Sequence, residues 1–198
     1  MDQHVHTQLR LFFNELLKFN KTVNLIPSKT IANCDLIHFA DSINAAHIVS
    51  KKANDNEYMY DIGSGSGFPG LVYGILFPRQ KMVLVEIDDR KVQFLNHVVT
   101  LLNLTNIKVE NKKAESFGTD SITQIICRDF ANLTKTLMTF RKSVKLGGVI
   151  YSLKSDEWSM EISQIPTQLC SSWKPLLLAE YKLPVTDIKF YVVEATKI

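Results

Sequence analysis

A glycine-rich stretch at residues 58–70 limits the possible folds of this chain more than any other segment. It begins with a short apolar run, which is followed by four glycines: Gly63, Gly65, Gly67 and Gly70. Residues 71–77 then have the apolar pattern of a helix. Glycine is needed where φ is positive or where the backbone must approach a ligand closely. A strand, a glycine loop and a helix in this order predict a nucleotide-type site in an α/β sheet.

Two classes of ligand compete for this loop. Gly65, Gly67 and Gly70 match the dinucleotide pattern G-x-G-x-x-G, although a glycine-rich turn satisfies that pattern easily. Asp61 lies two residues before the first glycine, where its carboxylate would repel a pyrophosphate bound at the helix N-terminus. A carboxylate at this position suits a ligand with a cationic amino group. The order of residues therefore favours S-adenosylmethionine over a nicotinamide dinucleotide.

The composition is that of a soluble globular protein. The chain has 198 residues, of which 45% are hydrophobic and 22% charged, and no apolar run reaches the length of a membrane span. Its first residues do not have the pattern of a secretion signal, and three cysteines without metal-ligand spacing suit a reducing compartment. We therefore expect a cytoplasmic protein without a membrane partner, and a monomer. The net charge of +3 permits an RNA partner without requiring one.

The apolar periodicity predicts two unequal parts of one compact structural unit. Residues 1–50 are expected to form a small helical cap with helices at 8–19 and 31–49, and residues 51–198 a sheet domain. Five strands that alternate with helices are predicted at residues 58–62, 82–87, 107–110, 122–127 and 149–154. The helices between and after them are predicted at residues 70–77, 88–103, 133–145 and 156–169, the third closed by Gly147-Gly148 and the last broken near Pro166.

Two apolar runs at residues 175–183 and 189–195 have no helix between them and predict an antiparallel pair. The whole pattern predicts an α/β fold with a mostly parallel, doubly wound sheet and an antiparallel C-terminal edge.

Polar residues at the predicted strand ends are the candidate site residues, because ligands of such sheets lie beyond the carboxyl ends of the strands. Glu86 lies at the end of the second strand, about twenty residues past the glycines, where an acid can bind ribose hydroxyls. Ala114 and Glu115 follow the third strand, where they can contact the amine of an adenine. Arg128 and Lys154 end the fourth and fifth strands, and a guanidinium at such a place can bind a carboxylate or a phosphate. No catalytic triad, metal-binding set or carboxylate pair emerges, so no metal is expected.

These motifs resemble the bacterial 16S ribosomal RNA guanine-N7 methyltransferases, also called the glucose-inhibited division protein B family. The most specific match is Gly67-Phe68-Pro69-Gly70, which distinguishes this family from most methyltransferases. Similar segments extend through most of the chain: residues 16–25, 38–42, 61–70, 90–91, 94–95, 114–115, 128–133 and 153–154. The resemblance implies a Rossmann-like methyltransferase fold and methylation of one guanine N7 in 16S ribosomal RNA.

The resemblance also implies S-adenosylmethionine bound by a defined set of residues: Gly63, Phe68, Glu86, Ala114, Glu115 and Arg128. Asp61 and Gly65 join this set from the loop pattern. Guanine N7 has a free lone pair and no proton, so no general base is needed and alignment can supply most of the catalysis. His38, Asp41 and Lys154 are then expected to orient the substrate, which is 16S ribosomal RNA or the small ribosomal subunit.

The sequence departs from the family at four positions. Ile37 replaces a basic residue, Asp129 an alanine, Ser155 a glycine and Ile188 an arginine. These departures leave two alternatives open. The chain can be a methyltransferase for a small molecule or protein, or a non-catalytic RNA-binding relative, and Asp129 is the best support for the latter.

Overall fold

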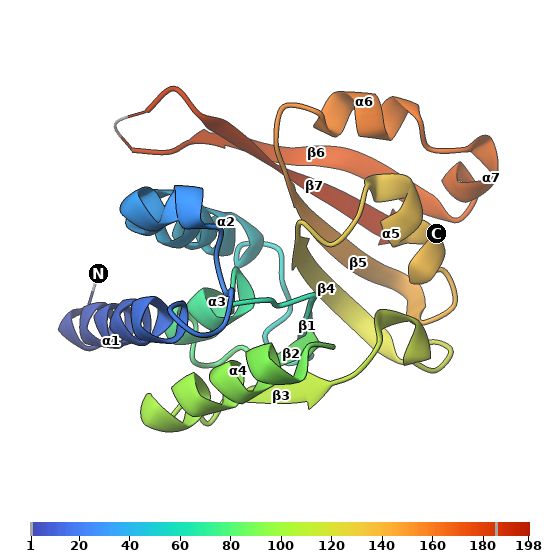
Figure 1. The fold of residues 1–198 in the computed structure, drawn as a ribbon. Helices are drawn as coiled ribbons and strands as arrows, with labels where there is room; N and C mark the ends of the chain where they lie inside the picture. The colour runs from blue at the N-terminus through green and yellow to red at the C-terminus, as the bar shows by residue number, and fades with distance from the viewer. Residues whose placement is uncertain (1, 185) are drawn as a thin grey trace.

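The fold is a seven-stranded sheet with helices on both faces (Figure 1). The structure is a computed structural model, and it describes residues 2–184 and 186–198. The strands lie in the order β3-β2-β1-β4-β5-β7-β6. Their bounds are β1 Met59–Ile62, β2 Met82–Glu86, β3 Ile107–Asn111, β4 Ile122–Arg128, β5 Val144–Lys154, β6 Trp173–Lys182 and β7 Lys189–Lys197. Strands β1 to β5 pair in parallel, and β7 pairs antiparallel with both β5 and β6, which confirms the predicted mixed sheet.

The strand order reverses between β1 and β4, which are neighbours in the sheet. From β1 the chain runs outward to β2 and β3, then returns to β4 and continues to β5. Such a switch point opens a crevice beyond the carboxyl ends of the strands. The glycine loop leaves β1 at this place, and Arg128 ends the neighbouring β4.

The helices form two layers. On one face lie α1 Gln3–Phe19, α2 Asp41–Val49, α3 Gly70–Leu76 and α4 Asp89–Leu101, and on the other lie α5 Leu133–Thr139, α6 Trp158–Ser163 and α7 Thr167–Cys170. Each layer buries its own apolar cluster against the sheet. Among the described residues, no helix is long and apolar enough to cross a membrane.

The N-terminal helices share an aromatic cluster with the sheet domain. The Phe12 ring of α1 is fully buried, and its centroid lies 5.0 Å from that of Phe39 and 5.2 Å from that of Phe68, which belongs to the glycine loop. The predicted single helix at 31–49 is three segments: a 3₁₀-helix at Ser28–Asn33, a π-helix at Asp35–Ala40 and α2. The π-helix carries His38, which agrees with the tendency of such turns to occur at functional sites.

The predicted helix at 133–145 is too long. Helix α5 ends at Thr139, and β5 already begins at Val144, which is fully buried and pairs in register with Ile122 of β4. Gly147 and Gly148 therefore lie inside a strand rather than at a helix end. The register between β4 and β5 shifts at this point, and Gly147 has a φ of 76°, so the two glycines form a bulge that a helix pattern in the sequence conceals.

Candidate functional site

The glycine loop has the backbone conformation that its sequence predicts. Gly63, Gly65 and Gly67 have φ values of 72°, 57° and 95°, which side chains with a Cβ rarely adopt. The backbone N–H of Gly65 donates to Oε2 of Glu86 at 2.8 Å. Oε1 of Glu86 accepts the N–H groups of Ile87 at 2.7 Å and Asp88 at 2.9 Å. Three backbone donors thus fix the Glu86 carboxylate beside the loop.

A cavity of about 370 Å³ lies beside this carboxylate. We name it the glycine-loop pocket, and its lining includes Gly63, Glu86, Ile87, Ala114, Glu115 and Phe130. Four of the predicted cofactor residues therefore come together here: Gly63, Glu86, Ala114 and Glu115. Ala114 and Glu115 belong to a short 3₁₀-helix, Ala114–Ser116, that follows β3. Gly65 is adjacent, where it holds Glu86 through its backbone.

Asp61 lies beneath the loop and does not line the glycine-loop pocket. Its side chain is fully buried, and Oδ2 accepts the N–H of Gly70 at 3.0 Å, which fixes the start of α3. Burial raises the pKa of this carboxyl group to about 7. Oδ1 has no hydrogen-bond partner among the described residues. A Cβ at Gly70 would collide with Asp61, so the glycine is needed for this close approach.

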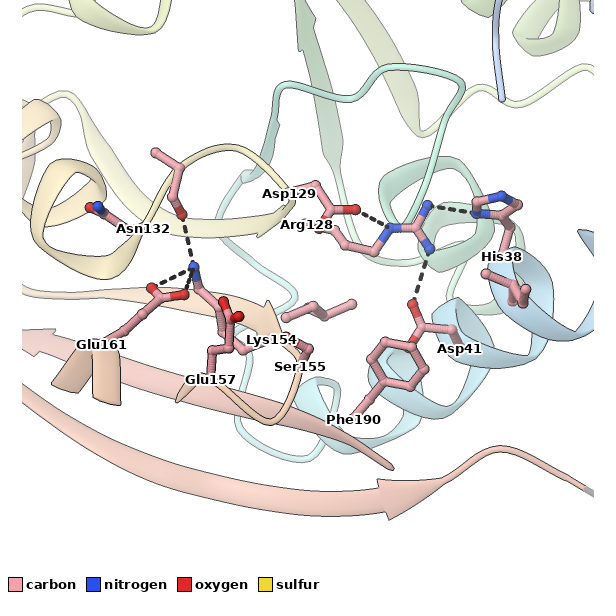
Figure 2. A pocket seen from close by; sticks show the side chains of 13 residues that line it. His38, Asp41, Arg128, Asp129, Asn132, Lys154, Ser155, Glu157, Glu161 and Phe190 are labelled. Carbon is pink, nitrogen blue, oxygen red and sulfur yellow. Dashed lines mark hydrogen bonds and ion pairs between the residues drawn. The ribbon is translucent and has the colours of Figure 1, made fainter. Parts of the chain in front are cut away.

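A second cavity lies beyond the ends of β4 and β5. We name it the arginine pocket, and its lining includes His38, Asp41, Arg128, Asp129 and Lys154 (Figure 2). Arg128 Nη1 donates to Oδ2 of Asp41 at 3.0 Å, and Nη2 lies 3.1 Å from Nδ1 of His38. The structure therefore brings Arg128, predicted for the cofactor, together with His38 and Asp41, predicted for the substrate.

Phe68 supports this group from below. The Arg128 guanidinium lies 5.3 Å from the centroid of the buried Phe68 ring, and the His38 ring stacks on the same phenyl group at 5.3 Å. Burial and the neighbouring Arg128 charge lower the pKa of His38 to about 4, so its imidazole is neutral at pH 7. His38 Nε2 lies 3.0 Å from Oγ1 of Thr30. The predicted cofactor residue Phe68 thus acts as a platform for polar side chains.

Tyr181 of β6 completes the group, and sequence reasoning missed it. Its hydroxyl donates to Oδ1 of Asp41 at 2.5 Å. The Asp41 side chain is 1% exposed, so both of its oxygens are shielded from solvent. Burial raises the pKa of Asp41, whereas Arg128 and Tyr181 act in the opposite direction. No local sequence pattern points to Tyr181, because it lies 140 residues from Asp41 along the chain.

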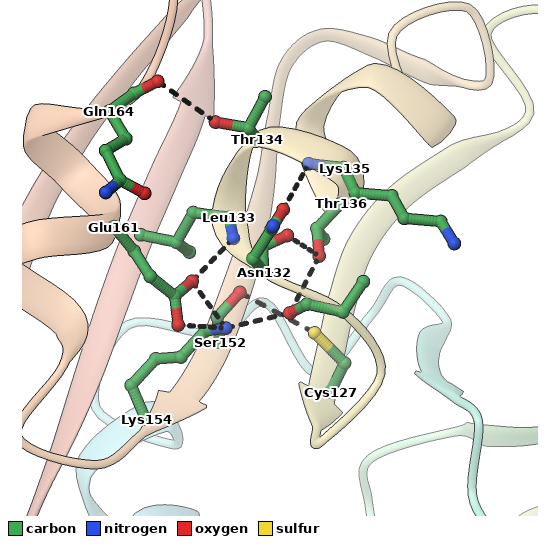
Figure 3. A network of polar contacts seen from close by, with 11 residues as sticks. Cys127, Asn132, Leu133, Thr134, Lys135, Thr136, Ser152, Lys154, Glu161 and Gln164 are labelled. Atoms are coloured by element: carbon green, nitrogen blue, oxygen red, sulfur yellow. Dashed lines mark hydrogen bonds and ion pairs between the residues drawn. The ribbon is translucent and has the colours of Figure 1, made fainter.

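Lys154 lines the arginine pocket, but its ammonium group is bound within the protein (Figure 3). Nζ lies 2.8 Å from Oε2 of Glu161 in α6 and donates to the carbonyl oxygen of Ala131 at 2.8 Å. Glu161 Oε2 also accepts the N–H of Leu133 at 2.6 Å. Lys154 therefore connects the end of β5 to α6 and to the loop after β4. Glu161 was a further residue that the sequence did not indicate.

Three of the four departures from the family pattern line the arginine pocket: Ile37, Asp129 and Ser155. Asp129 has a φ of 56°, and its carboxylate lies 3.8 Å from Nε of Arg128. Ile188 lies elsewhere, beside the start of β7, where its carbonyl oxygen accepts the N–H of Leu183. Among the described residues, no group of three or more metal-ligating side chains is placed to hold an ion.

Comparison with known proteins identifies relatives along nearly the whole chain. A family model described as rRNA small subunit methyltransferase G matches residues 5–181. The chain is 49% identical over 194 residues to the ribosomal RNA small subunit methyltransferase G 3 of Bdellovibrio bacteriovorus, a match that covers 98% of this chain and 88% of that protein. It is 30% identical over 167 residues to the ribosomal RNA small subunit methyltransferase G of Paracoccus denitrificans, with 84% and 83% covered.

Solved structures agree in fold. A SAM dependent methyltransferase from Aquifex aeolicus has a TM-score of 0.63 at 11% identity and covers 87% of this chain and 100% of its own. A precorrin-6y C5,15-methyltransferase from Geobacter metallireducens has a TM-score of 0.57 at 15% identity, with 77% and 87% covered. These two share the methyltransferase sheet with this chain. The sequence matches show more than a shared fold: the chain belongs to the rRNA small subunit methyltransferase G family.

Proposed function

We propose that this chain transfers the methyl group of S-adenosylmethionine to N7 of a guanine in 16S ribosomal RNA. The observation that carries the proposal is the meeting of two pockets at one short segment. Phe130 lines the glycine-loop pocket, whereas its neighbours Arg128, Asp129 and Ala131 line the arginine pocket. A donor bound in the first pocket and a base bound in the second would meet across this segment.

The glycine-loop pocket has the features that an adenosine moiety needs. Glu86 is fixed by three backbone N–H groups, and its oxygens have further lone pairs for ribose hydroxyls. Ile87 is 58% exposed at the pocket wall and offers an apolar surface for a base. Ala114 and Glu115 line the same pocket, and Gly63 leaves room for close approach. These residues would hold the cofactor, which supplies an electrophilic methyl group on a sulfonium.

The buried Asp61 lines neither pocket, but its charge would favour a cationic ligand held beside the glycine loop. Its Oδ1 is an acceptor without a donor among the described residues, and leaving such an atom unpaired costs about 1–3 kcal/mol. A positive charge bound nearby would favour the ionised form of a carboxyl group whose pKa burial has raised to about 7. The sulfonium and amino groups of S-adenosylmethionine both carry such a charge.

The residues of the arginine pocket position the acceptor rather than remove a proton. Guanine N7 attacks with its own lone pair, so the site needs no general base. His38 is neutral, Asp41 is bound to Arg128 and Tyr181, and Lys154 is bound to Glu161. Such an interlocked set keeps its geometry while a base enters, and accurate alignment of the reacting atoms is the main source of rate in a direct transfer.

Ribosomal RNA is the proposed partner, and the small ribosomal subunit is its assembled form. Lysines of the cap region, among them Lys18, Lys21 and Lys29, can add salt-dependent phosphate contacts. The proposed enzyme acts as a monomer in the cytoplasm.

Cofactor titration and methyl transfer together test the proposal. Calorimetry should detect S-adenosylmethionine binding to the chain alone. With tritiated cofactor, the label should then be transferred to small subunits that lack N7 methylation. Less label should be transferred at higher salt concentration. The variant Glu86→Gln should bind the cofactor more weakly, and it serves as the control for binding in the glycine-loop pocket. Binding without transfer to either subunits or naked 16S ribosomal RNA would contradict the RNA substrate, and no binding at all would contradict the whole proposal.

A further inference from the structure

The charges that line the arginine pocket do not balance. Two basic side chains, Arg128 and Lys154, face four carboxylates: Asp41, Asp129, Glu157 and Glu161. Arg128 pairs with Asp41 at 3.0 Å and Lys154 with Glu161 at 2.8 Å. The two remaining carboxylates, Asp129 and Glu157, leave the pocket with surplus negative charge. Since both cations are engaged, the pocket is poorly suited to a phosphate and well suited to a group with hydrogen-bond donors.

Asp129 is the surplus carboxylate at the junction of the two pockets. It follows directly after β4 and precedes Phe130, which lines the glycine-loop pocket. Its side chain is 91% exposed, and the contact to Arg128 Nε, at 3.8 Å, leaves carboxylate lone pairs free. The left-handed φ of 56° fixes the direction in which the side chain leaves the backbone, and aspartate tolerates this conformation better than most residues.

Guanine presents the complement of a carboxylate. Its N1–H and 2-amino group are adjacent donors on the edge of the purine opposite N7, and a carboxylate can accept from both at once. Adenine presents an unprotonated N1 at the same place, which a carboxylate would repel. We propose that Asp129 accepts hydrogen bonds from N1–H and the 2-amino group of the target guanine, selects guanine over adenine, and leaves N7 directed toward the methyl donor.

This inference rests on the proposed function, and it assigns Asp129 a role in the rate as well. During transfer the S–CH₃ bond breaks, its electrons stay on sulfur, and the N7 lone pair forms the new N–CH₃ bond. Sulfur becomes a neutral thioether and the guanine ring becomes a cation, without loss of a proton. A carboxylate at N1–H binds the cationic ring more strongly than the neutral one. Asp129 therefore stabilises the transition state more than the bound substrate.

Asp129→Asn is the direct test, with Asp120→Asn as its matched control. Both aspartates have left-handed φ values, 56° and 51°, and asparagine tolerates that conformation. Asp120 lies in the turn before β4, outside the lining of both pockets. Asp129→Asn should lower kcat on small subunits by about tenfold and leave the Kd for S-adenosylmethionine within about twofold. Asp120→Asn should retain wild-type values.

A subunit reconstituted with inosine at the methylated position separates base contact from a general charge effect. Inosine lacks only the 2-amino group, so the wild type should methylate it several-fold more slowly, while Asp129→Asn should show no such difference. Equal wild-type rates on guanosine and inosine would overturn the inference. A wild-type kcat in Asp129→Asn would also overturn it, as would equal losses of kcat in Asp129→Asn and Asp120→Asn. A wild type that methylates neither substrate would instead defeat the proposed function, and this inference with it.

Discussion

Replacing Tyr181 with phenylalanine removes one oxygen atom from the centre of the site. The hydroxyl is the partner of Asp41 Oδ1 at 2.5 Å, and Asp41 in turn holds Arg128 through its other oxygen at 3.0 Å. The Tyr181 ring, which lies against Phe190 with a centroid separation of 6.2 Å, keeps its contacts in the variant. The substitution therefore tests the hydrogen bond alone.

The size of the effect follows from the burial of Asp41. A hydrogen bond to a charged group contributes about 1.5–3 kcal/mol, and the 1% exposed carboxylate has no access to water as a substitute. We expect Tyr181→Phe to lower the free energy of unfolding by about 2 kcal/mol and Tm by about 4–8 °C. Because Asp41 loses one of the two groups that fix it, it holds Arg128 less firmly, and kcat/KM should also fall by about tenfold.

The loss of stability should depend on pH in a defined direction. Burial raises the pKa of Asp41 in the folded protein above its ordinary value of 3.8, and the Tyr181 hydroxyl counteracts this rise. A carboxyl group with a raised pKa contributes stability that is present below 3.8 and is lost as pH rises through the folded pKa. Without the hydroxyl this pKa rises further, so Tyr181→Phe should cost more stability at pH 7 than at about pH 4.

Urea unfolding of the wild type and the variant at several pH values measures both effects. Tyr151→Phe is the control, because Tyr151 is a sheet tyrosine in β5 that, unlike Tyr181, makes no hydrogen bond to Asp41 among the described residues. Equal unfolding midpoints for Tyr181→Phe and the wild type at pH 7, together with unchanged kcat/KM, would refute the role given to this network. A penalty that grows toward low pH would refute the assignment to Asp41.

Three further predictions concern the loop and His38. Gly70→Ala brings a Cβ within 2.5 Å of Asp61 Cβ and 2.6 Å of a Leu84 methyl group, so thermal unfolding should show a loss of about 1–3 kcal/mol; an unchanged Tm would contradict the close packing. Glu86→Gln should weaken S-adenosylmethionine binding by about tenfold in calorimetry, and wild-type affinity would exclude Glu86 as a ligand. Because the pKa of His38 is lowered to about 4, its titration should not change the rate between pH 6 and 8. A change in the wild-type rate near pH 6.5 that disappears in His38→Asn would contradict this prediction.

The sequence predicts most of the sheet because its signals are local. Each central strand is a short apolar run bounded by turn residues, and the glycine loop marks the switch point by its backbone requirements alone. Gly63, Glu86, Ala114 and Glu115 lie at or just after the carboxyl ends of β1, β2 and β3, so the parallel topology brings them to one edge of the sheet. That part of the site was predictable from strand order.

The rest depends on contacts between distant segments. Tyr181 reaches Asp41 only because the C-terminal hairpin folds back beside the N-terminal cap, and no local pattern encodes that approach. Arg128 and Lys154 were predicted to bind the cofactor or the substrate at strand ends, yet each forms an ion pair within the folded chain, with Asp41 and Glu161 respectively. The helix predicted at 133–145 was too long because Val144 and Gly147 belong to β5. This strand contains a bulge, and its register is fixed only by pairing with the neighbouring β4.

The most direct test of the proposed activity is the identity of the methylated atom. Small ribosomal subunits without N7-methylguanosine would be incubated with the purified chain and S-adenosylmethionine, and the 16S ribosomal RNA then digested to nucleosides for mass spectrometry. We predict one 7-methylguanosine per RNA, confirmed by chain cleavage specific to N7-methylated guanosine. Methyl groups on another atom or another nucleoside, or none, would contradict the proposed activity.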